Sequence, residues 1–280
     1  MAKKPTAHYD EIGYWSEVKL DIIRKYAGAY STIMAKQSFV KRHVYIDAFA
    51  GAGTHVSKTT GETIAGSPVN AMAIQPKFSE LHFIDLNGRR TAELRRLAAD
   101  DPRVHVHDGD CNEVLLRDVF PRCRYEDYSR ALCLLDPYKL NVNWEVLRTA
   151  GHMKSIDVFY NFMIMDANMN VFMRDPSKVT PEQAARMDAV WGDASWRAAA
   201  YRQTEDLFGT HEEKATNEAI AEAFRERLKT VAGFAHVPKP IPMRNSRGAT
   251  VYYLYFATPK PVAAKIVADI FNTYRDREAA

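Results

Sequence analysis

The 280-residue chain has few cysteines and no long apolar run, and these absences exclude several classes of protein. Its three cysteines, Cys111, Cys123 and Cys133, form no C-x-x-C pair and have no histidine at the spacing of a zinc site. We therefore expect free thiols and no metal. The first ten residues are polar, unlike a signal peptide, and no segment is long enough to span a membrane. A soluble, cytoplasmic protein without a membrane partner is expected.

The chain also lacks a strong excess of either charge. With 38 Lys and Arg against 35 Asp and Glu, the net charge is only +3, and acidic residues lie between the basic pairs. This distribution favours a mixed solvated surface over a basic nucleic-acid footprint, although it does not exclude such a partner. The 46% hydrophobic content is ordinary for a globular protein and argues against extended disorder.

Short apolar runs alternate with helical segments through the first half of the chain. An amphipathic helix is predicted over residues 12–36, because its apolar residues recur at steps of three and four. Buried strands are predicted at 43–46, 81–84, 104–106, 131–135 and 156–163, with helices between them. Strands this apolar indicate a parallel sheet covered on both faces, and right-handed crossovers make a doubly wound α/β sheet the simplest topology.

The second half breaks this rhythm. Residues 166–230 are charged and rich in helical patterns, which predicts a helical insertion. A hairpin follows, with strands predicted at 234–243 and 250–257, and a final helix from Pro261 to Tyr274. Prolines in the first of these strands place it at the sheet edge. An α/β unit that ends in an antiparallel hairpin is typical of the methyltransferase subgroup of Rossmann folds. We predict one domain over 1–280, with a cofactor-binding core at 43–163 and the hairpin and helix at 231–280.

Carboxylates follow four consecutive predicted strands at their carboxyl ends. Asp47, Asp85 and Asp136 end the first, second and fourth strands, and Asp108 and Asp110 follow the third. Because the carboxyl ends of parallel strands form the ligand-binding edge of an open α/β sheet, these residues are expected to surround one ligand.

A glycine-rich turn after the first strand narrows the choice of ligand. Gly51 and Gly53 allow close backbone approach and positive φ. A dinucleotide site would need a third small residue at position 56, which is Val56, and the next helix is delayed by a polar loop. S-adenosylmethionine contains no phosphate and so needs no phosphate-binding helix N-terminus. Its positively charged ammonium group would be favoured near Asp47.

Roles can be assigned to the other strand ends, each with a plainer alternative. Asp85 is placed to accept the ribose hydroxyls, or else caps the following helix. Of Asp108 and Asp110, one is predicted to reach the adenine amino group while the other caps the next helix, and Asp110 is the choice for the adenine. The segment Asp136-Pro137-Tyr138 is predicted to hold an amino nucleophile beside the methyl group, Tyr138 stacking on a planar acceptor. A plain strand-to-helix turn is an equal alternative for that segment.

Other aromatic and histidine residues receive structural predictions. His43, His82 and His105 alternate with apolar residues in strands and are interpreted as sheet-face histidines. Trp191 and Trp196 are interpreted as core of the insertion, with an acceptor pocket as the alternative.

Several ordered segments resemble the three-Cys-motif partner protein (TcmP) family. They are the D-x-F-x-G-x-G block from Asp47 through Phe49 to Gly53, Gly66-Ser-Pro68, Phe83-Ile-Asp-Leu-Asn87, Gly109-Asp-Cys-Asn-Glu113, Leu135-Asp-Pro137 with Trp144, and Tyr252 to Thr258. The resemblance spans nearly the whole chain. It implies a Rossmann-like methyltransferase fold, S-adenosylmethionine as cofactor and a separate partner protein that carries a three-cysteine motif.

The same glycine-rich block resembles, more broadly, amino-methyltransferases whose fourth motif has two prolines. This chain has one, followed by Tyr138 and Lys139, which departs from the motif for exocyclic amines. By resemblance, the cofactor residues are Asp47, Phe49, Gly51, Gly53, Asp85 and Asp110, and the catalytic candidates are Asp136, Pro137 and Tyr138.

Three functional hypotheses result. The first is an S-adenosylmethionine-dependent methyltransferase acting on an amino or related nucleophile, of a small molecule or a nucleic acid. The second is a non-catalytic, accessory partner of a three-cysteine-motif protein similar to radical S-adenosylmethionine proteins. The third, a nicotinamide-dependent dehydrogenase, conflicts with the missing third glycine.

Overall fold

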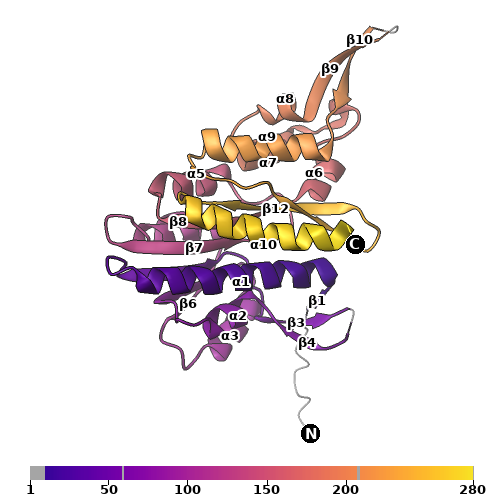
Figure 1. Ribbon diagram of the computed structural model, residues 1–280. Coiled ribbons are helices and arrows are strands. Elements are labelled where there is room, and N and C mark those ends of the chain that lie inside the picture. Colours follow the sequence, from indigo (N-terminus) through magenta and orange to yellow (C-terminus); the bar gives the residue numbers. More distant parts are fainter. Residues whose placement is uncertain (1–9, 59, 207–208, 280) are drawn as a thin grey trace.

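A seven-stranded sheet forms the centre of the computed structural model, which describes residues 10–58, 60–206 and 209–279 (Figure 1). The strand order is β11-β12-β8-β7-β2-β5-β6. The five strands from β8 to β6 pair in parallel, whereas β12 pairs antiparallel with both β8 and β11. The strands are β2 (Arg42–Asp47), β5 (Glu80–Asp85), β6 (Val104–Asp108), β7 (Ser129–Leu135), β8 (Ile156–Phe162), β11 (Ile241–Arg244) and β12 (Thr250–Ala257).

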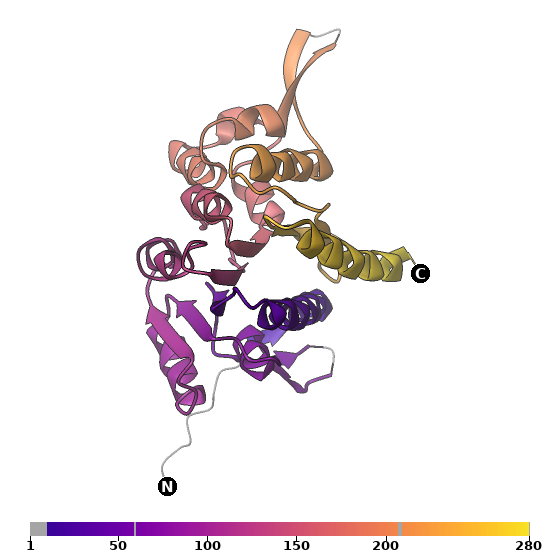
Figure 2. The same cartoon turned by 60° about the vertical axis from the view of Figure 1, so that its left-hand side comes forward.

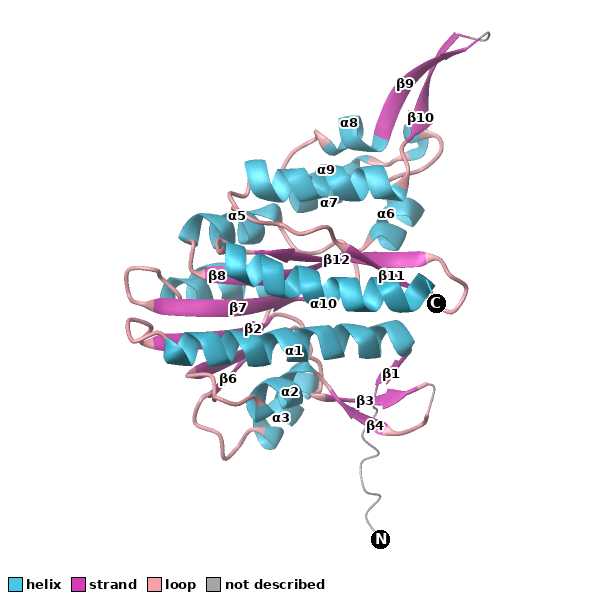
Figure 3. Ribbon diagram, viewed as in Figure 1, coloured by secondary structure: helices cyan, strands magenta, loops and turns pink. Residues whose placement is uncertain are grey.

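The sheet is covered by helices on both faces, as the apolar composition of its strands requires. All seven residues of β7 and of β8 are buried, which only a sheet packed on two sides can achieve. One face packs on α1 (Tyr14–Lys36), α2 (Ser67–Ala73), α3 (Gly88–Leu97) and α10 (Pro261–Ala279). Figures 1 and 3 show α1 and α10 side by side across this face. The predicted α/β fold is therefore confirmed.

The opposite face packs on helices from the middle of the chain. They are α4 (Cys111–Val114), the short π and 3₁₀ turns η1 (Leu115–Val119) and η2 (Phe120–Arg122), α5 (Trp144–Met153), α6 (Ile164–Asn170), α7 (Pro181–Trp191), α8 (Trp196–Ala200) and α9 (Asn217–Thr230), with η3 (Pro176–Lys178) between α6 and α7. Trp191 and Trp196 are buried in this core, as the structural interpretation predicted. Their indoles pack against Phe162, Phe224 and Phe172.

The C-terminal hairpin has the predicted arrangement, with β11 at the sheet edge and β12 inside the sheet. Its first strand is shorter than expected, because residues 234–240 form only one isolated bridge, between His236 and Thr258. Pro238 and Pro240 have no N–H to donate, so a ladder cannot extend through them.

Two polar hairpins correct the sequence-based interpretation. The loop predicted between Thr54 and Ala65 contains β3 (Thr54–Ser57) and β4 (Thr63–Ala65), which form a small sheet with β1 (Asp10–Ile12). The insertion predicted to be helical carries β9 (Tyr201–Asp206) and β10 (Gly209–Lys214), a ribbon that projects away from the body of the molecule (Figure 2). Short polar strands lack the apolar alternation that predicts a strand from sequence.

Residues 1–9, whose polar composition argues against a signal peptide, lie outside the described residues. Across the described part of the chain, none of the helices combines the length and the apolar character needed to cross a membrane.

Candidate cofactor site

The predicted strand-end carboxylates meet at one edge of the sheet. In the register of the sheet, Asp47 lies opposite Phe83 on one side and Leu134 on the other. Asp85 and Asp136 each follow two residues later on those neighbouring strands. Between β2 and β7 the chain reverses the direction in which strands are added, and this switch point opens a crevice at the carboxyl edge.

Asp85 ties the glycine-rich turn to the neighbouring strand. Its Oδ2 accepts the Gly51 N–H at 3.0 Å, and its Oδ1 accepts the Asn87 N–H at 2.8 Å. Gly51 has a φ of +65°, which glycine adopts without the strain that a side chain adds. Asp85 does not cap α3, since that helix begins after Asn87, whose side chain accepts the Arg89 N–H. The carboxylate retains further lone pairs that a ligand can use.

Gly53 provides close packing rather than ligand contact. Its φ is +87°, and a Cβ there would lie 2.9 Å from the Leu97 side chain. Ser67 is the first residue of α2, and Gly66 precedes it as the N-cap. The turn therefore leads into the β3–β4 hairpin, and α2 begins only after that hairpin.

Asp47 is a fully buried carboxyl group beneath this turn. Its Oδ1 accepts the Phe49 N–H at 3.2 Å, while its Oδ2 has no hydrogen-bond partner among the described residues. Burial raises the pKa of Asp47 to about 7, although the Ser67 hydroxyl and the Phe49 N–H oppose the shift. Burying a carboxyl group with one oxygen unpaired is unfavourable, which makes it a candidate for a cationic ligand group.

One cavity at this edge has a volume of about 480 Å³. Asp85 and Asp110 line it together with the apolar Phe49 and the exposed Leu86. Asp110 also caps α4, accepting the Asn112 N–H at 2.8 Å. Of the two carboxylates after β6, only Asp110 faces this cavity, because Asp108 bonds to Thr91 and Arg95 outside it.

A second cavity of about 210 Å³ shares Phe49 and Tyr138 with the first. Gly51, Asp136 and Pro137 also line it. The two cavities therefore adjoin one another at Phe49 and Tyr138. Tyr138 is 63% exposed, and its ring faces the Arg90 guanidinium at 6.0 Å. All the residues predicted for the donor and acceptor sites line one of these cavities, except Asp47 and Gly53, which line neither.

Sequence reasoning missed the partners of Asp136. Lys19, on α1, forms an ion pair with one carboxylate oxygen, and the Asn161 amide, on β8, donates to the other. Although burial alone would lower the pKa of Lys19, the Asp136 carboxylate raises it above its usual value. One signal was available, because Lys19 stands four residues after Trp15 and three before Ile22 on the apolar face of the helix.

The chain is similar to several solved structures. A Legionella pneumophila protein of family DUF519 is 11% identical, with a TM-score of 0.52 over 94% of this chain and 92% of its own. A Thermobifida fusca protein assigned as a methyltransferase is 14% identical, with a TM-score of 0.45 over 88% and 80%. A Leishmania major SAM-dependent methyltransferase of family DUF858 is 10% identical, with a TM-score of 0.39 over 86% and 72%. No family model and no curated protein matches the chain.

The strand order, with its antiparallel β12, is that of a Rossmann-like methyltransferase fold. Its β12 stands antiparallel between β8 and β11, which is the arrangement expected from the hairpin pattern. At these identities the likeness concerns the fold alone, and the resemblance to TcmP stays a prediction.

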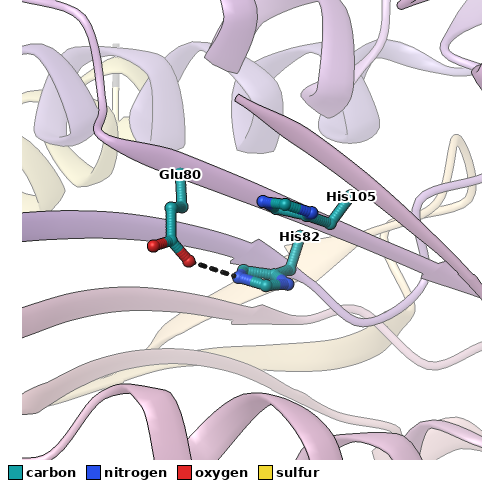
Figure 4. Close-up of side chains that lie close together, drawn as sticks. All are labelled: Glu80, His82 and His105. Atoms are coloured by element: carbon teal, nitrogen blue, oxygen red, sulfur yellow. Dashed lines mark hydrogen bonds and ion pairs between the residues drawn. The ribbon is translucent and has the colours of Figure 1, made fainter. Parts of the chain in front are cut away.

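A separate cluster of histidines lies on β5 and β6, on one face of the sheet (Figure 4). His82 and His105 stack across the two strands with ring centroids 4.9 Å apart, as expected for sheet-face histidines. With Glu80 they bring possible metal-ligand atoms within 4.8 Å of one another. The Glu80 carboxylate, however, also accepts from Arg122 at 3.1 Å and Arg42 at 3.4 Å. Two guanidinium groups compete with a cation for that carboxylate.

This cluster predicts acid sensitivity. Burial lowers the pKa of His82 to about 4, below its ordinary value of 6.5, although Glu80 opposes the shift and His105 and His107 reinforce it. Because His82 binds a proton less readily in the folded protein than in the unfolded chain, the free energy of unfolding falls as the pH drops from 6.5 through 4. His82→Gln is expected to remove about 3 kcal/mol of the fall in unfolding free energy between pH 7 and pH 4. Urea denaturation at each pH measures it.

The matched control is His152→Gln, at an exposed histidine of α5. The control is expected to keep the wild-type pH dependence. If the unfolding free energy of His82→Gln falls with pH as steeply as that of the wild-type protein, His82 is not the source of the acid sensitivity.

Proposed function

We propose that the protein binds S-adenosylmethionine across the two adjoining cavities and transfers its methyl group to an amino or related nucleophile. The observation that carries this proposal is the shared border of Phe49 and Tyr138, with carboxylates on both sides. A ligand that extends through both cavities would have one end beside Asp85 and its other end beside Asp136. The methyl donor has this two-ended character, with an adenosine and an amino-acid part.

The residues present fit such a ligand. Asp85 is suited to accept ribose hydroxyls, and Asp110 to accept from the adenine amino group, while Phe49 offers an apolar surface for the base. Asp47, behind Gly51, supplies negative potential for a sulfonium or ammonium group. A dinucleotide would instead need a helix N-terminus directly after the glycine-rich turn, where this chain has the β3–β4 hairpin.

On the acceptor side, the chain provides positioning rather than proton transfer. Lys19 and Asn161 hold the Asp136 carboxylate in place, and Pro137 stiffens the exit of β7. Tyr138, largely exposed at the junction, offers a face for a planar acceptor. The bound S-adenosylmethionine would supply the electrophilic methyl group. Methyl transfer depends chiefly on in-line alignment, for which rigid neighbours of this kind are suited.

The alternative proposal is an accessory protein that retains the cofactor site and acts with a protein bearing a three-cysteine motif. The ion pair between Lys19 and Asp136 favours it, because both Asp136 oxygens already have partners. Binding of S-adenosylmethionine without methyl transfer to any substrate presented with that partner would support this role. Methyl transfer by the purified chain alone would exclude it.

The cofactor proposal predicts a selective loss of affinity. Asp85→Asn is expected to weaken S-adenosylhomocysteine binding at least tenfold, because a hydrogen bond to a charged group contributes about 1.5–3 kcal/mol. Isothermal titration calorimetry with S-adenosylmethionine and S-adenosylhomocysteine measures the change.

Asp108→Asn is the matched control, since Asp108 ends the neighbouring strand but lies outside the cavity. It is expected to bind as the wild-type protein does. The cofactor proposal fails if neither compound binds the wild-type protein, or if the two variants lose affinity equally.

A further inference from the structure

A third cavity, of about 350 Å³, lies at the opposite edge of the sheet from the proposed cofactor site. It is formed by the last turns of α1, the start of α10 and the amino ends of β7 and β8. Ile33, Met34 and Val262 contribute to a lining that is predominantly apolar. The volume falls within the range of small-molecule sites. We infer that this cavity binds an amphiphilic anion, whose apolar body fills it and whose carboxylate or phosphate group contacts Arg130.

Arg130 is the first observation that points to an anion. The residue is only 7% exposed, and among the described residues no ion pair links its guanidinium to a carboxylate. The group packs 3.7 Å from the centre of the Tyr125 ring and donates to the carbonyl oxygens of Tyr125 and Ser129. A buried cation without a counter-ion is costly, and an anionic ligand would supply the missing charge.

Tyr30 provides a second, independent observation. Its side chain lines the cavity and is 3% exposed, yet its hydroxyl has no hydrogen-bond partner among the described residues. A ligand oxygen would accept from this hydroxyl and satisfy it. A buried polar atom without a partner is uncommon, so this hydroxyl, beside a buried cation that lacks a counter-ion, indicates a ligand rather than ordinary packing.

The remaining charges of the cavity agree with this assignment. Lys154 and Lys260, both exposed, add positive charge to the lining. Asp157 is the opposing charge in the cavity, and its oxygens accept from the Tyr26 hydroxyl at 2.6 Å and the Thr258 hydroxyl at 2.5 Å. With three cations against one hydrogen-bonded acid, the lining attracts an anion.

The apolar part of the site continues to the surface. Phe39 is 49% exposed and Val262 is 61% exposed, and both line the cavity. The Arg130 guanidinium also faces the Phe39 ring at 5.7 Å. Aromatic surface and a cation are therefore adjacent at the opening, as a ligand with an acyl or alkyl body and a charged head requires.

The test is calorimetric titration of the full chain with decanoate, decyl phosphate and decanol, with inorganic phosphate as a fourth probe. Decanoate or decyl phosphate is expected to bind at least tenfold more tightly than decanol, and the stronger of the two identifies the head group. Inorganic phosphate is expected to bind weakly, because it has no apolar body. The inference is overturned if neither amphiphilic anion binds, or if decanol binds equally well.

Variants locate the binding. Arg130→Met keeps the length and apolar character of the side chain and is expected to weaken binding at least tenfold, whereas Arg124→Met, at an exposed arginine bonded to Glu126, is the matched control. Tyr30→Phe, which removes only the unpartnered hydroxyl, is expected to weaken binding severalfold and decides the question if Arg130→Met does not fold. Unchanged affinity in Tyr30→Phe and in any folded Arg130→Met would refute the inference. These variants are expected to bind S-adenosylhomocysteine with the affinity of the wild-type protein, which would show that this cavity is separate from the cofactor site.

Discussion

Asp136→Ala is expected to lower the free energy of unfolding by about 3 kcal/mol, because it leaves the Lys19 ammonium without a partner. The Lys19 side chain is 11% exposed and that of Asp136 is 27% exposed, so the pair is largely removed from water. The Asn161 amide would lose its acceptor as well. Removing one member of a buried pair costs more than the pair itself contributes, since the remaining charge stays desolvated. Equilibrium urea denaturation measures the loss.

A double-mutant cycle separates the ion pair from general damage at the site. The double variant Lys19→Met/Asp136→Asn is expected to be more stable than the sum of the two single changes predicts. Each single change leaves one buried charge without its partner, whereas the double change removes both charges. Asp118→Ala, at a surface pair with Arg117, is the matched control and is expected to cost far less than Asp136→Ala, because solvent screens an exposed pair. A loss in Asp136→Ala no larger than in this control would contradict the buried-pair assignment.

Asp47→Asn is expected to stabilise the protein increasingly as the pH rises. The pKa of Asp47 in the folded protein is about 7, raised by burial above its ordinary value of 3.8. A carboxyl group with a raised pKa contributes stability that is full below pH 3.8 and is lost as the pH rises through 7. The variant, which is neutral throughout, should therefore gain roughly 2.5 kcal/mol relative to the wild-type protein between pH 5 and pH 8. Denaturant titrations at both pH values test this.

Asp108→Asn serves as the control for charge removal at a strand end. The Thr91 hydroxyl and Arg95 lower the pKa of Asp108, so removing this charge is not expected to stabilise the protein at high pH. If Asp47→Asn shows no gain between pH 5 and pH 8, the buried carboxyl group is not ionised as described. A gain in stability together with weaker S-adenosylmethionine binding would indicate that this unfavourable group is retained for the ligand.

The sequence by itself determined the architecture and the edge at which the strand-end carboxylates meet. Apolar runs of the length found in β2, β5 and β7 can be buried only in a sheet covered on both faces. Because parallel strands share a carboxyl edge, the residues that end these strands, Asp47, Asp85 and Asp136, had to meet. The prolines before β12 likewise placed β11 at an edge. Each of these inferences follows from local pattern and backbone chemistry.

Only the tertiary structure decided which partners those residues have. Lys19 and Asp136 are 117 residues apart, and no local pattern relates them. The polar hairpins β3–β4 and β9–β10 form without an apolar alternation that would reveal them. Arg130 similarly looks like an ordinary charge in the sequence, and becomes an unpaired buried cation only when Tyr125 and the ends of α1 and α10 close around it. Burial and ion pairing depend on contacts between segments that are distant in the chain. The sequence pattern could therefore locate the residues at the strand ends, but not the residues that pair with their charges.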